Sequence, residues 1–384
     1  MANFLCRAAE CSNRQTLVSN FDTGRDGIPP QLADGHDSEN AFWHRTPATP
    51  PAEVRFGRGP APWSRTEQST RNLLSQDHRL WHIGHELMNK LPLLLLGCAL
   101  LPVRGETLSE RYAGYGELIV TPLASAPFPH PKRAEGHKYQ NKLYPATEHY
   151  SDNTVAIFIP KGFRETGQLD FIVHFHGWKN DVEGVLGQYK LVEQLSESGR
   201  NAILVVPQGP RNAPDSFGGK LEDPDGFKRF MADVVDTLRQ KSGLKKKDFA
   251  LGQIALSGHS GGYEVISAIV DRGGLTAHVR EVWLFDALYA QTDKFLAWID
   301  RHQGRFIDLY TEHGGTKAET ERLMDTLKQR GTAFFAGKEG EAKPADLQAN
   351  KLVFLYTDLP HNDVVNKRQE FREFLQTSCF GKRE

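Results

Sequence analysis

The chain has 384 residues, and its 47 basic and 48 acidic side chains leave a formal charge of −1. This balance provides no global basic field to hold a phosphate backbone, so it disfavours nucleic acid as a partner. A hydrophobic content of 39% and a charged content of 25% are typical of a soluble globular protein, and four cysteines are too few for a disulfide scaffold.

Residues 1–87 differ in composition from the rest of the chain. All 21 lysines lie at Lys90 or later, whereas residues 1–87 contain nine arginines. The segment is rich in proline, serine, glycine and aspartate, and it has no sustained apolar period. Its prolines, Pro29 and Pro30 among them, interrupt any helix or strand. We therefore predict that residues 1–87 are a disordered extension, or that the natural chain begins after them.

Residues 88–105 have the proportions of a signal peptide. A basic start at Lys90 precedes an apolar run of 11 residues, 91–101. Val103 and Gly105 are small enough for the −3 and −1 positions of a signal-peptidase site. The run is too short to span a bilayer of about 30 Å, so we expect no stable membrane span.

These features predict an exported protein, periplasmic or secreted, whose mature part is a single domain spanning 106–384. A natural start at Met88 would place the apolar run at the N-terminus, where a signal sequence must lie. Two alternatives stay open. Residues 95–98, Leu-Leu-Gly-Cys, resemble a bacterial lipobox, which would anchor a lipoprotein through Cys98. Otherwise the leucines form a buried helix behind a genuine disordered tail.

From about residue 150 the pattern alternates apolar runs with amphipathic segments. Strands are predicted at Thr154–Ile159, Leu169–Phe175, Ala202–Val206, Gln253–Leu256, Val279–Phe285, Arg305–Tyr310 and Lys351–Tyr356. Helices are predicted at Asp181–Ser198, around 227–238, around 265–270, and at about 291–301, 316–330 and 366–377. Residues 106–150 are predicted to be an irregular leader or an edge hairpin.

This order of elements indicates an α/β fold, with a mostly parallel central sheet covered by helices on both faces. Ligands of such sheets bind beyond the carboxyl ends of the strands, so chemistry is expected just after each strand.

The run Gly258-His259-Ser260-Gly261-Gly262 follows a predicted strand and opens a predicted helix. It has the G-x-S-x-G pattern, in which the serine lies on a strained strand-to-helix turn and glycines avoid Cβ clashes. The helix N-terminus favours negative charge that develops beside it. We predict that Ser260 is a nucleophile. The alternative is a Gly-rich packing turn with an N-capping serine.

With this motif, residues 150–380 resemble the α/β-hydrolase family. The resemblance implies a triad in the chain order Ser, acid, His. It assigns the base to His361, which follows the strand Lys351–Tyr356 and precedes the last predicted helix. The rival histidines are His278, His302 and His313.

The acid has two main candidates. Asp286 directly follows the strand Val279–Phe285, and a carboxylate after such an apolar run needs a partner to stay charged. The family more often takes its acid after the following strand, which ends at Glu312. Asp308 falls inside that strand and is expected to face a covering helix. We predict Asp286, with Glu312 as the alternative.

The run His174-Phe175-His176-Gly177-Trp178 ends another strand and resembles the His-Gly loop of the family. The resemblance implies an oxyanion hole at Gly177, Trp178 and Gly261, built from backbone N–H groups. His174 and His176 share one face of a strand, as zinc ligands can, but no HExxH motif or continuing histidine pattern supports a zinc site. The loop 209–226 is expected to shape the substrate pocket, or to be a plain surface loop.

Together these features predict an exported serine hydrolase that cleaves a carboxylic ester, or an amide, through an acyl-enzyme. Its substrate would be a small molecule, a peptide or another ester. No cofactor and no metal are expected, because no nucleotide-binding or metal motif occurs. The alternatives are a serine peptidase or amidase, and a non-catalytic ligand-binding protein on a hydrolase scaffold.

Overall fold

The computed structural model describes residues 105–383. The predicted extension, 1–87, and nearly all of the predicted signal-like segment lie outside the described residues. Nine strands form the main sheet of the described part: β1 (Gly116–Pro122), β4 (Thr154–Pro160), β5 (Gln168–Phe175), β6 (Ile203–Pro207), β7 (Ala250–His259), β8 (Val279–Phe285), β9 (Arg305–Thr311), β10 (Phe335–Lys338) and β11 (Leu352–Thr357).

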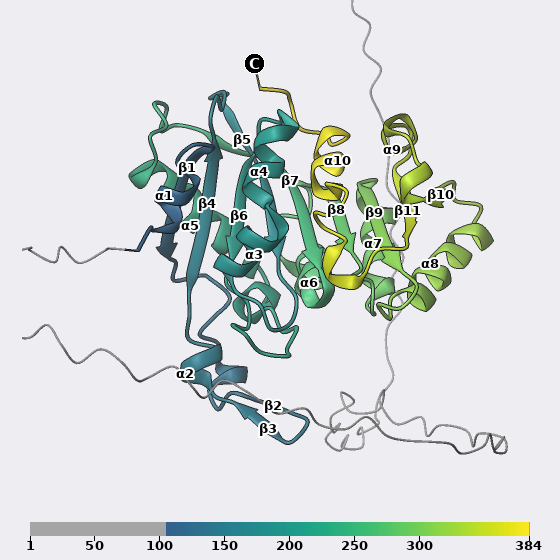
Figure 1. Cartoon of the computed structure of the whole chain (residues 1–384), viewed down its shortest axis with the longest axis horizontal. Coiled ribbons are helices and arrows are strands. Elements are labelled where there is room, and N and C mark those ends of the chain that lie inside the picture. The colour runs from purple at the N-terminus through teal and green to yellow at the C-terminus, as the bar shows by residue number, and fades with distance from the viewer. Residues whose placement is uncertain (1–104, 384) are drawn as a thin grey trace, which may run out of the picture. The chain divides into compact units, whose positions relative to one another are not determined.

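The strand order in this sheet is β1-β4-β6-β5-β7-β8-β9-β11-β10 (Figure 1). β1 pairs antiparallel with β4, and β4 pairs antiparallel with β6. All other neighbouring strands of the sheet are parallel. The predicted mostly parallel sheet is confirmed, and the carboxyl ends of β5 to β11 therefore meet at one edge.

Helices connect and cover the strands. They are α1 (Leu108–Tyr112), α2 (Ala146–His149), α3 (Val182–Tyr189), α4 (Leu191–Ser198), α5 (Gly226–Lys241), α6 (Tyr263–Arg272), α7 (Thr292–His302), α8 (Lys317–Gln329), α9 (Pro344–Ala349) and α10 (Glu370–Gln376). No helix in residues 105–383 combines the length and the apolar character needed to cross a membrane.

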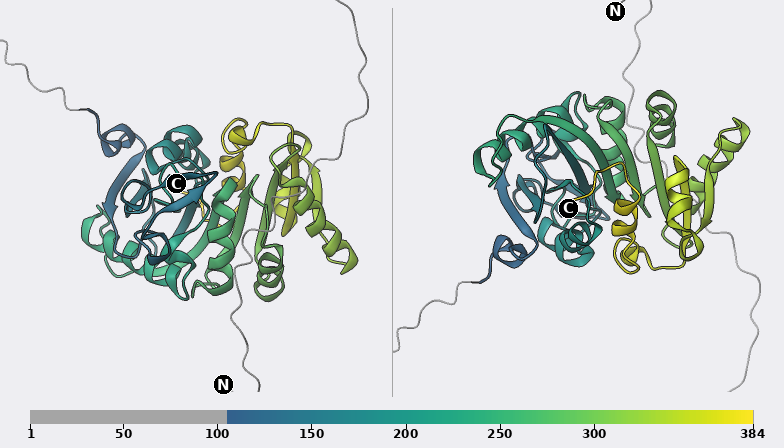
Figure 2. Two further views of the ribbon diagram at one scale, coloured as in Figure 1. Left: turned by 90° about the horizontal axis from the view of Figure 1, so that it is seen from below. Right: turned by 90° about the horizontal axis from the view of Figure 1, so that it is seen from above.

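Two hydrophobic cores flank the sheet, as expected for strands buried on both faces. Along β8, Val282 and Leu284 belong to the core under α5 to α8, whereas Trp283 and Phe285 belong to the core under α3, α4 and α10. Successive side chains of a strand point to opposite faces, so one apolar run supplies both cores. Figure 2 shows helices on both sides of the sheet.

The predicted helix Asp181–Ser198 is wrong as a single element. It is divided into α3 and α4 at Lys190, whose φ of 49° is left-handed. The last helix begins at Glu370 rather than 366, because Gln369 is also left-handed, with φ of 65°. Both breaks are single-residue conformations that leave the apolar periodicity on either side intact.

The prediction for 106–150 missed β1, an edge strand in which only Leu118 and Thr121 are buried. The hairpin in this segment, β2 (His137–Tyr139) with β3 (Lys142–Tyr144), forms a separate two-stranded sheet. Its two-residue turn places Gln140 and Asn141 at φ of 46° and 63°, which matches the twist of the strands. β10 and α9 were also missed, because both are short.

Candidate active site

Ser260 lies on a tight turn between the central strand β7 and helix α6. Its φ is 54°, a conformation that costs a non-glycine residue roughly 1–3 kcal/mol and that is typical of functional turns. A Cβ on Gly258 would lie 2.7 Å from the Ile266 side chain, and one on Gly262 would lie 2.6 Å from the carbonyl oxygen of Phe175. The strand-turn-helix context predicted for Ser260 is therefore present, and the glycines permit its close packing.

Asp286 and His361 are brought together from different strand ends. Nδ1 of His361 lies 2.5 Å from Oδ2 of Asp286. Asp286 directly follows β8 and is fully buried, whereas the His361 side chain, after β11, keeps 29% of its surface exposed. The contact joins a buried carboxylate to an imidazole that solvent or a ligand can reach.

Three further donors support the carboxylate of Asp286. Thr311 donates from its backbone N–H at 3.2 Å and from its hydroxyl at 2.9 Å, and the Thr316 hydroxyl donates to Oδ1. Burial alone would raise the pKa of Asp286, but the hydrogen bonds from His361, Thr316 and Thr311 lower it below its ordinary value. Asp286 is therefore held as an anion beside His361.

The rival acids do not contact His361. Glu312 points outward and forms an ion pair with Lys317 at 2.8 Å; the hydrogen bond from Lys317 lowers its pKa. Asp308 is buried and accepts a hydrogen bond from Thr320 of α8 at 2.6 Å. The expectation that Asp308 faces a covering helix is confirmed.

His259, inside the turn, contacts His361 from the other side. Its Nε2 lies 2.8 Å from the carbonyl oxygen of His361, and the two rings are 4.5 Å apart. Because a carbonyl can only accept, Nε2 carries the proton, so Nδ1 accepts from the Tyr189 hydroxyl at 2.8 Å. Burial, together with the nearby His361, lowers the pKa of His259 to about 3. His259 is thus a neutral residue that positions the main chain of His361.

Gly177 lies directly against the serine. A Cβ on Gly177 would be 2.5 Å from Cβ of Ser260 and 3.1 Å from its Oγ. The Gly177 carbonyl accepts a hydrogen bond from Nδ1 of His176 at 2.8 Å. Carbonyl and N–H of a trans peptide point in opposite directions, so the N–H of Trp178 is directed away from His176.

Neither histidine of this loop is placed as a metal ligand. His176 uses both ring nitrogens, since its Nε2 accepts from the backbone N–H of Gly209 at 2.9 Å. His174 is fully buried, and its Nδ1 lies 2.9 Å from the Ser257 hydroxyl. Burial lowers the pKa of both imidazoles. Within residues 105–383, no group of three or more His, Cys, Asp or Glu side chains is arranged to hold a metal ion.

Tyr289 lies close to the Ser260 side chain. Its hydroxyl donates to the Gly314 carbonyl at 2.7 Å, and its ring lies 6.5 Å from that of His361. Burial raises the pKa of Tyr289 to about 12, although a hydrogen bond with the Ser260 side chain opposes the increase. In the described part of the chain, no hydrogen bond joins Ser260 to His361; such bonds often form only when substrate is bound.

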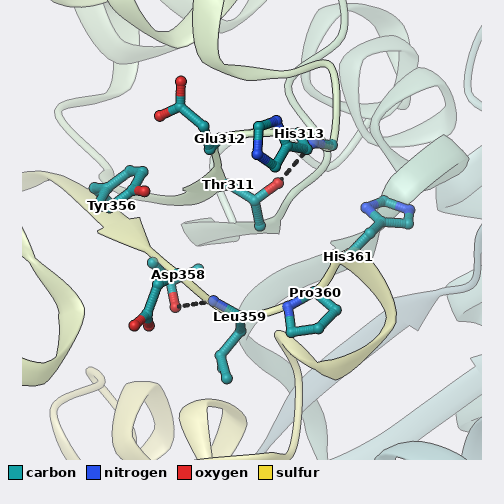
Figure 3. A pocket seen from close by; sticks show the side chains of 10 residues that line it. Thr311, Glu312, His313, Tyr356, Asp358, Leu359, Pro360 and His361 are labelled. Carbon is teal, nitrogen blue, oxygen red and sulfur yellow. Dashed lines mark hydrogen bonds between the residues drawn. The ribbon is translucent and has the colours of Figure 1, made fainter. Parts of the chain in front are cut away.

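A cavity of about 550 Å³ opens beside His361, between the ends of β9 and β11. Figure 3 shows Glu312, His313, Tyr356 and Asp358 around it, with His361 at its border. Its walls carry both polar groups and apolar surface, including the Leu359 side chain. The cavity could hold a polar organic group next to the imidazole.

The loop 209–226 reaches the same edge of the sheet, as expected for a loop that shapes the site. The Ser216 hydroxyl accepts a hydrogen bond from Nε1 of Trp178 at 2.8 Å. The ring of Tyr139, from the β2–β3 hairpin, packs edge-on against Trp178 at 5.1 Å. The contacts of Ser216, Tyr139 and Tyr189 could not be predicted from the sequence, because nothing in the local pattern distinguishes these residues from surface or core residues.

No protein-family model and no curated protein sequence matches the chain. Three of the solved structures that match are each 12% identical to it. A feruloyl esterase module from Clostridium thermocellum matches 68% of this chain and 88% of its own, with a TM-score of 0.44. A fluorophosphonate-binding serine hydrolase from Staphylococcus aureus matches 69% and 100%, with a TM-score of 0.41. An S-formylglutathione hydrolase from Agrobacterium tumefaciens matches 69% and 96%, with a TM-score of 0.41.

The strand order of the sheet and the serine turn after β7 agree with the resemblance to the α/β-hydrolase family expected from the sequence. The chain has the α/β-hydrolase fold.

Proposed function

We propose that the protein is a serine hydrolase that cleaves a carboxylic ester, or an amide, through an acyl-enzyme. Ser260 is the nucleophile, His361 the general base and Asp286 the acid that orients it. The observation that carries this proposal is the 2.5 Å contact of Asp286 with Nδ1 of His361, at the sheet edge where Ser260 is held in a left-handed turn.

The chemistry follows from the protonation of the pair. Because Asp286 is held as an anion, it fixes the proton of His361 on Nδ1 and leaves Nε2 to accept one. As Ser260 Oγ bonds to the carbonyl carbon, its proton passes to Nε2. The same proton then goes to the leaving alcohol or amine, and water repeats the sequence to release the acid.

Backbone donors complete the proposed site. The developing oxyanion would accept from the N–H groups of Trp178 and Gly261, with Gly177 allowing the main chain to approach Ser260. The cavity beside His361 is proposed to take the leaving group, because His361 must protonate that group as it departs.

A turnover panel of matched esters and amides tests the proposal, with Ser260→Ala as the paired variant. We expect hydrolysis of at least one ester by the natural protein and a loss of about 10³-fold or more in Ser260→Ala. Faster turnover of amides than of esters would favour the peptidase or amidase alternative. Tight binding without turnover would favour the ligand-binding alternative.

We also propose that the protein is exported. The support is the sequence of residues 88–105, with Lys90 before an apolar run and small residues at Val103 and Gly105. N-terminal sequencing of the protein purified from its source tests this. A mature chain that starts near residue 106 is expected, and a chain that retains residues before Met88 would contradict the proposal. A lipid on Cys98 would support the lipoprotein alternative.

A further inference from the structure

We propose that Ser216 is a further catalytic residue, whose hydroxyl donates a hydrogen bond to the oxyanion formed when Ser260 attacks the substrate. This inference rests on the serine-hydrolase function proposed above. It concerns a side chain of the loop after β6, beyond the backbone donors already named.

The Ser216 hydroxyl lies directly against the main chain that carries one of those donors. A Cβ on Gly261 would be only 2.5 Å from Oγ of Ser216 and 3.2 Å from Nε1 of Trp178. Gly261 follows the nucleophile Ser260, and its N–H is a proposed oxyanion donor. The side chains of Ser216 and Trp178 therefore occupy the space beside this donor.

The hydroxyl of Ser216 has a hydrogen available to donate. Its oxygen lies 2.8 Å from Nε1 of Trp178, and an indole N–H can only donate. Ser216 must therefore accept in this bond, which uses one oxygen lone pair and leaves its O–H without a role. Among residues 105–383, this hydroxyl forms no second hydrogen bond. Ser216 is half-buried, so a substrate can reach it.

The main chain on both sides of Ser216 is held in place. Oδ1 of Asp215 accepts from the backbone N–H of Phe217 at 3.0 Å, which closes a turn around Ser216. Oδ2 of Asp215 is bound by Nε of Arg133 at 2.7 Å, and the guanidinium of Arg133 lies 4.7 Å from the centre of the Phe217 ring. A donor fixed in this way needs little reorganisation when charge develops beside it.

In the proposed step, negative charge develops on the substrate carbonyl oxygen beside the N–H of Gly261. As Ser260 Oγ bonds to the carbonyl carbon, its proton goes to His361 and the C=O π electrons move onto the carbonyl oxygen. The resulting oxyanion accepts hydrogen bonds from the N–H groups of Trp178 and Gly261 and from the Ser216 O–H. Hydrogen bonds to an ionised oxygen are short and strong. Because this bond forms in the transition state, its loss should lower kcat and leave KM nearly unchanged.

The test compares the natural protein with Ser216→Ala on the best ester found in the panel. We expect kcat to fall by about 10²-fold and KM to change by less than about twofold. Ser260 Oγ adds to the carbonyl of a trifluoromethyl ketone and forms a tetrahedral alkoxide. The affinity of Ser216→Ala for this inhibitor should fall by the same factor. The control is Ser125→Ala, which removes a 2.6 Å hydrogen bond to Asp233 outside the site and should keep the natural kcat.

Two results would overturn the role of Ser216. One is a kcat within about threefold of the natural protein, since an oxyanion donor contributes far more. The other is a loss confined to KM, which would mean that Ser216 shapes ground-state binding instead. Trp178→Phe provides a second variant if Ser216→Ala does not fold. It keeps an aromatic ring but removes the donor that holds Ser216, so an intermediate loss of kcat is expected and an unchanged kcat would also contradict the proposal.

The two proposals fail in different ways. A natural protein that hydrolyses no ester or amide refutes the serine-hydrolase function itself. An active natural protein with an equally active Ser216→Ala refutes the role of Ser216 alone.

Discussion

Gly314 packs onto the carboxylate of Asp286 so closely that a Cβ atom at this position would overlap Oδ2 of Asp286. The same oxygen makes the 2.5 Å contact with His361. The backbone N–H of Gly314 bonds the Thr311 hydroxyl at 2.8 Å, and that hydroxyl in turn donates to Asp286. The loop after β9 thus holds Asp286 in place, and it can pack this closely because Gly314 has no side chain.

Gly314→Ala should therefore displace Asp286 from His361. We expect kcat to fall by about 10²-fold or more, because a misoriented base loses most of its effect. Gly187→Ala is the matched control: its added methyl meets nothing within 4 Å, and alanine in helix α3 should stabilise the fold by about 0.5–1 kcal/mol. Steady-state kinetics and thermal melts of both variants check this. An active Gly314→Ala would contradict the role of this close packing.

Asp286→Asn should reduce kcat by about 10³-fold or more, because an amide cannot hold the His361 proton on Nδ1 as a carboxylate does. Glu312→Gln should retain nearly natural activity, since Glu312 is exposed and paired with Lys317. Steady-state kinetics of both variants on one ester decide which of the two carboxylates is the acid of the triad. A large loss in Glu312→Gln alone would overturn the assignment of Asp286.

Asp308 should make the stability depend on pH. Burial raises its pKa to about 7, with a smaller contribution from the charge of Asp286 and an opposing hydrogen bond from Thr320. Between about pH 4 and about pH 7 the unfolded chain therefore releases this proton while the folded chain keeps it. The free energy of unfolding of the natural protein should fall across this range, by at most about 1.4 kcal/mol per pH unit relative to Asp308→Asn.

Urea unfolding of the natural protein and Asp308→Asn over this pH range measures the difference. The two curves should diverge up to about pH 7 and run parallel above it. A difference that does not change with pH would mean that Asp308 ionises normally in the folded chain.

The ion pair of Arg133 with Asp215 should stabilise the fold strongly. Both side chains are largely buried, at 20% and 6% exposure, so Arg133→Met would leave a buried carboxylate without its main partner. We expect a loss of about 3 kcal/mol or more in the free energy of unfolding. Lys328→Met breaks an exposed pair with Asp325 and should cost less than about 1 kcal/mol. Equal losses in the two variants would show that the buried pair stabilises the fold no more than the exposed one.

Much of the fold could be predicted because the central strands are largely apolar, as for Ala202–Val206. The elements that were missed have weaker signals. β1 lies at the sheet edge and buries only two of its seven residues, and β10 is four residues long. The break at Lys190 could not be seen, because one left-handed residue leaves the apolar pattern of α3 and α4 unchanged.

The candidate site was only partly predictable, for a different reason. Ser260, Asp286 and His361 each follow a strand, so sheet topology predicts that they share an edge. The choice between Asp286 and Glu312 depends on the path of the loop after β9, which directs Glu312 outward. The supports of the site, such as Thr316 and Ser216, come from loops whose contacts no local pattern specifies.

Fluorophosphonate labelling followed by peptide mapping tests the central claim most directly. We expect one phosphonyl adduct per chain, on Ser260, with labelling lost in Ser260→Ala and slowed by about 10²-fold or more in His361→Ala. An unlabelled natural protein, or an adduct that maps to another serine and persists in Ser260→Ala, would contradict it.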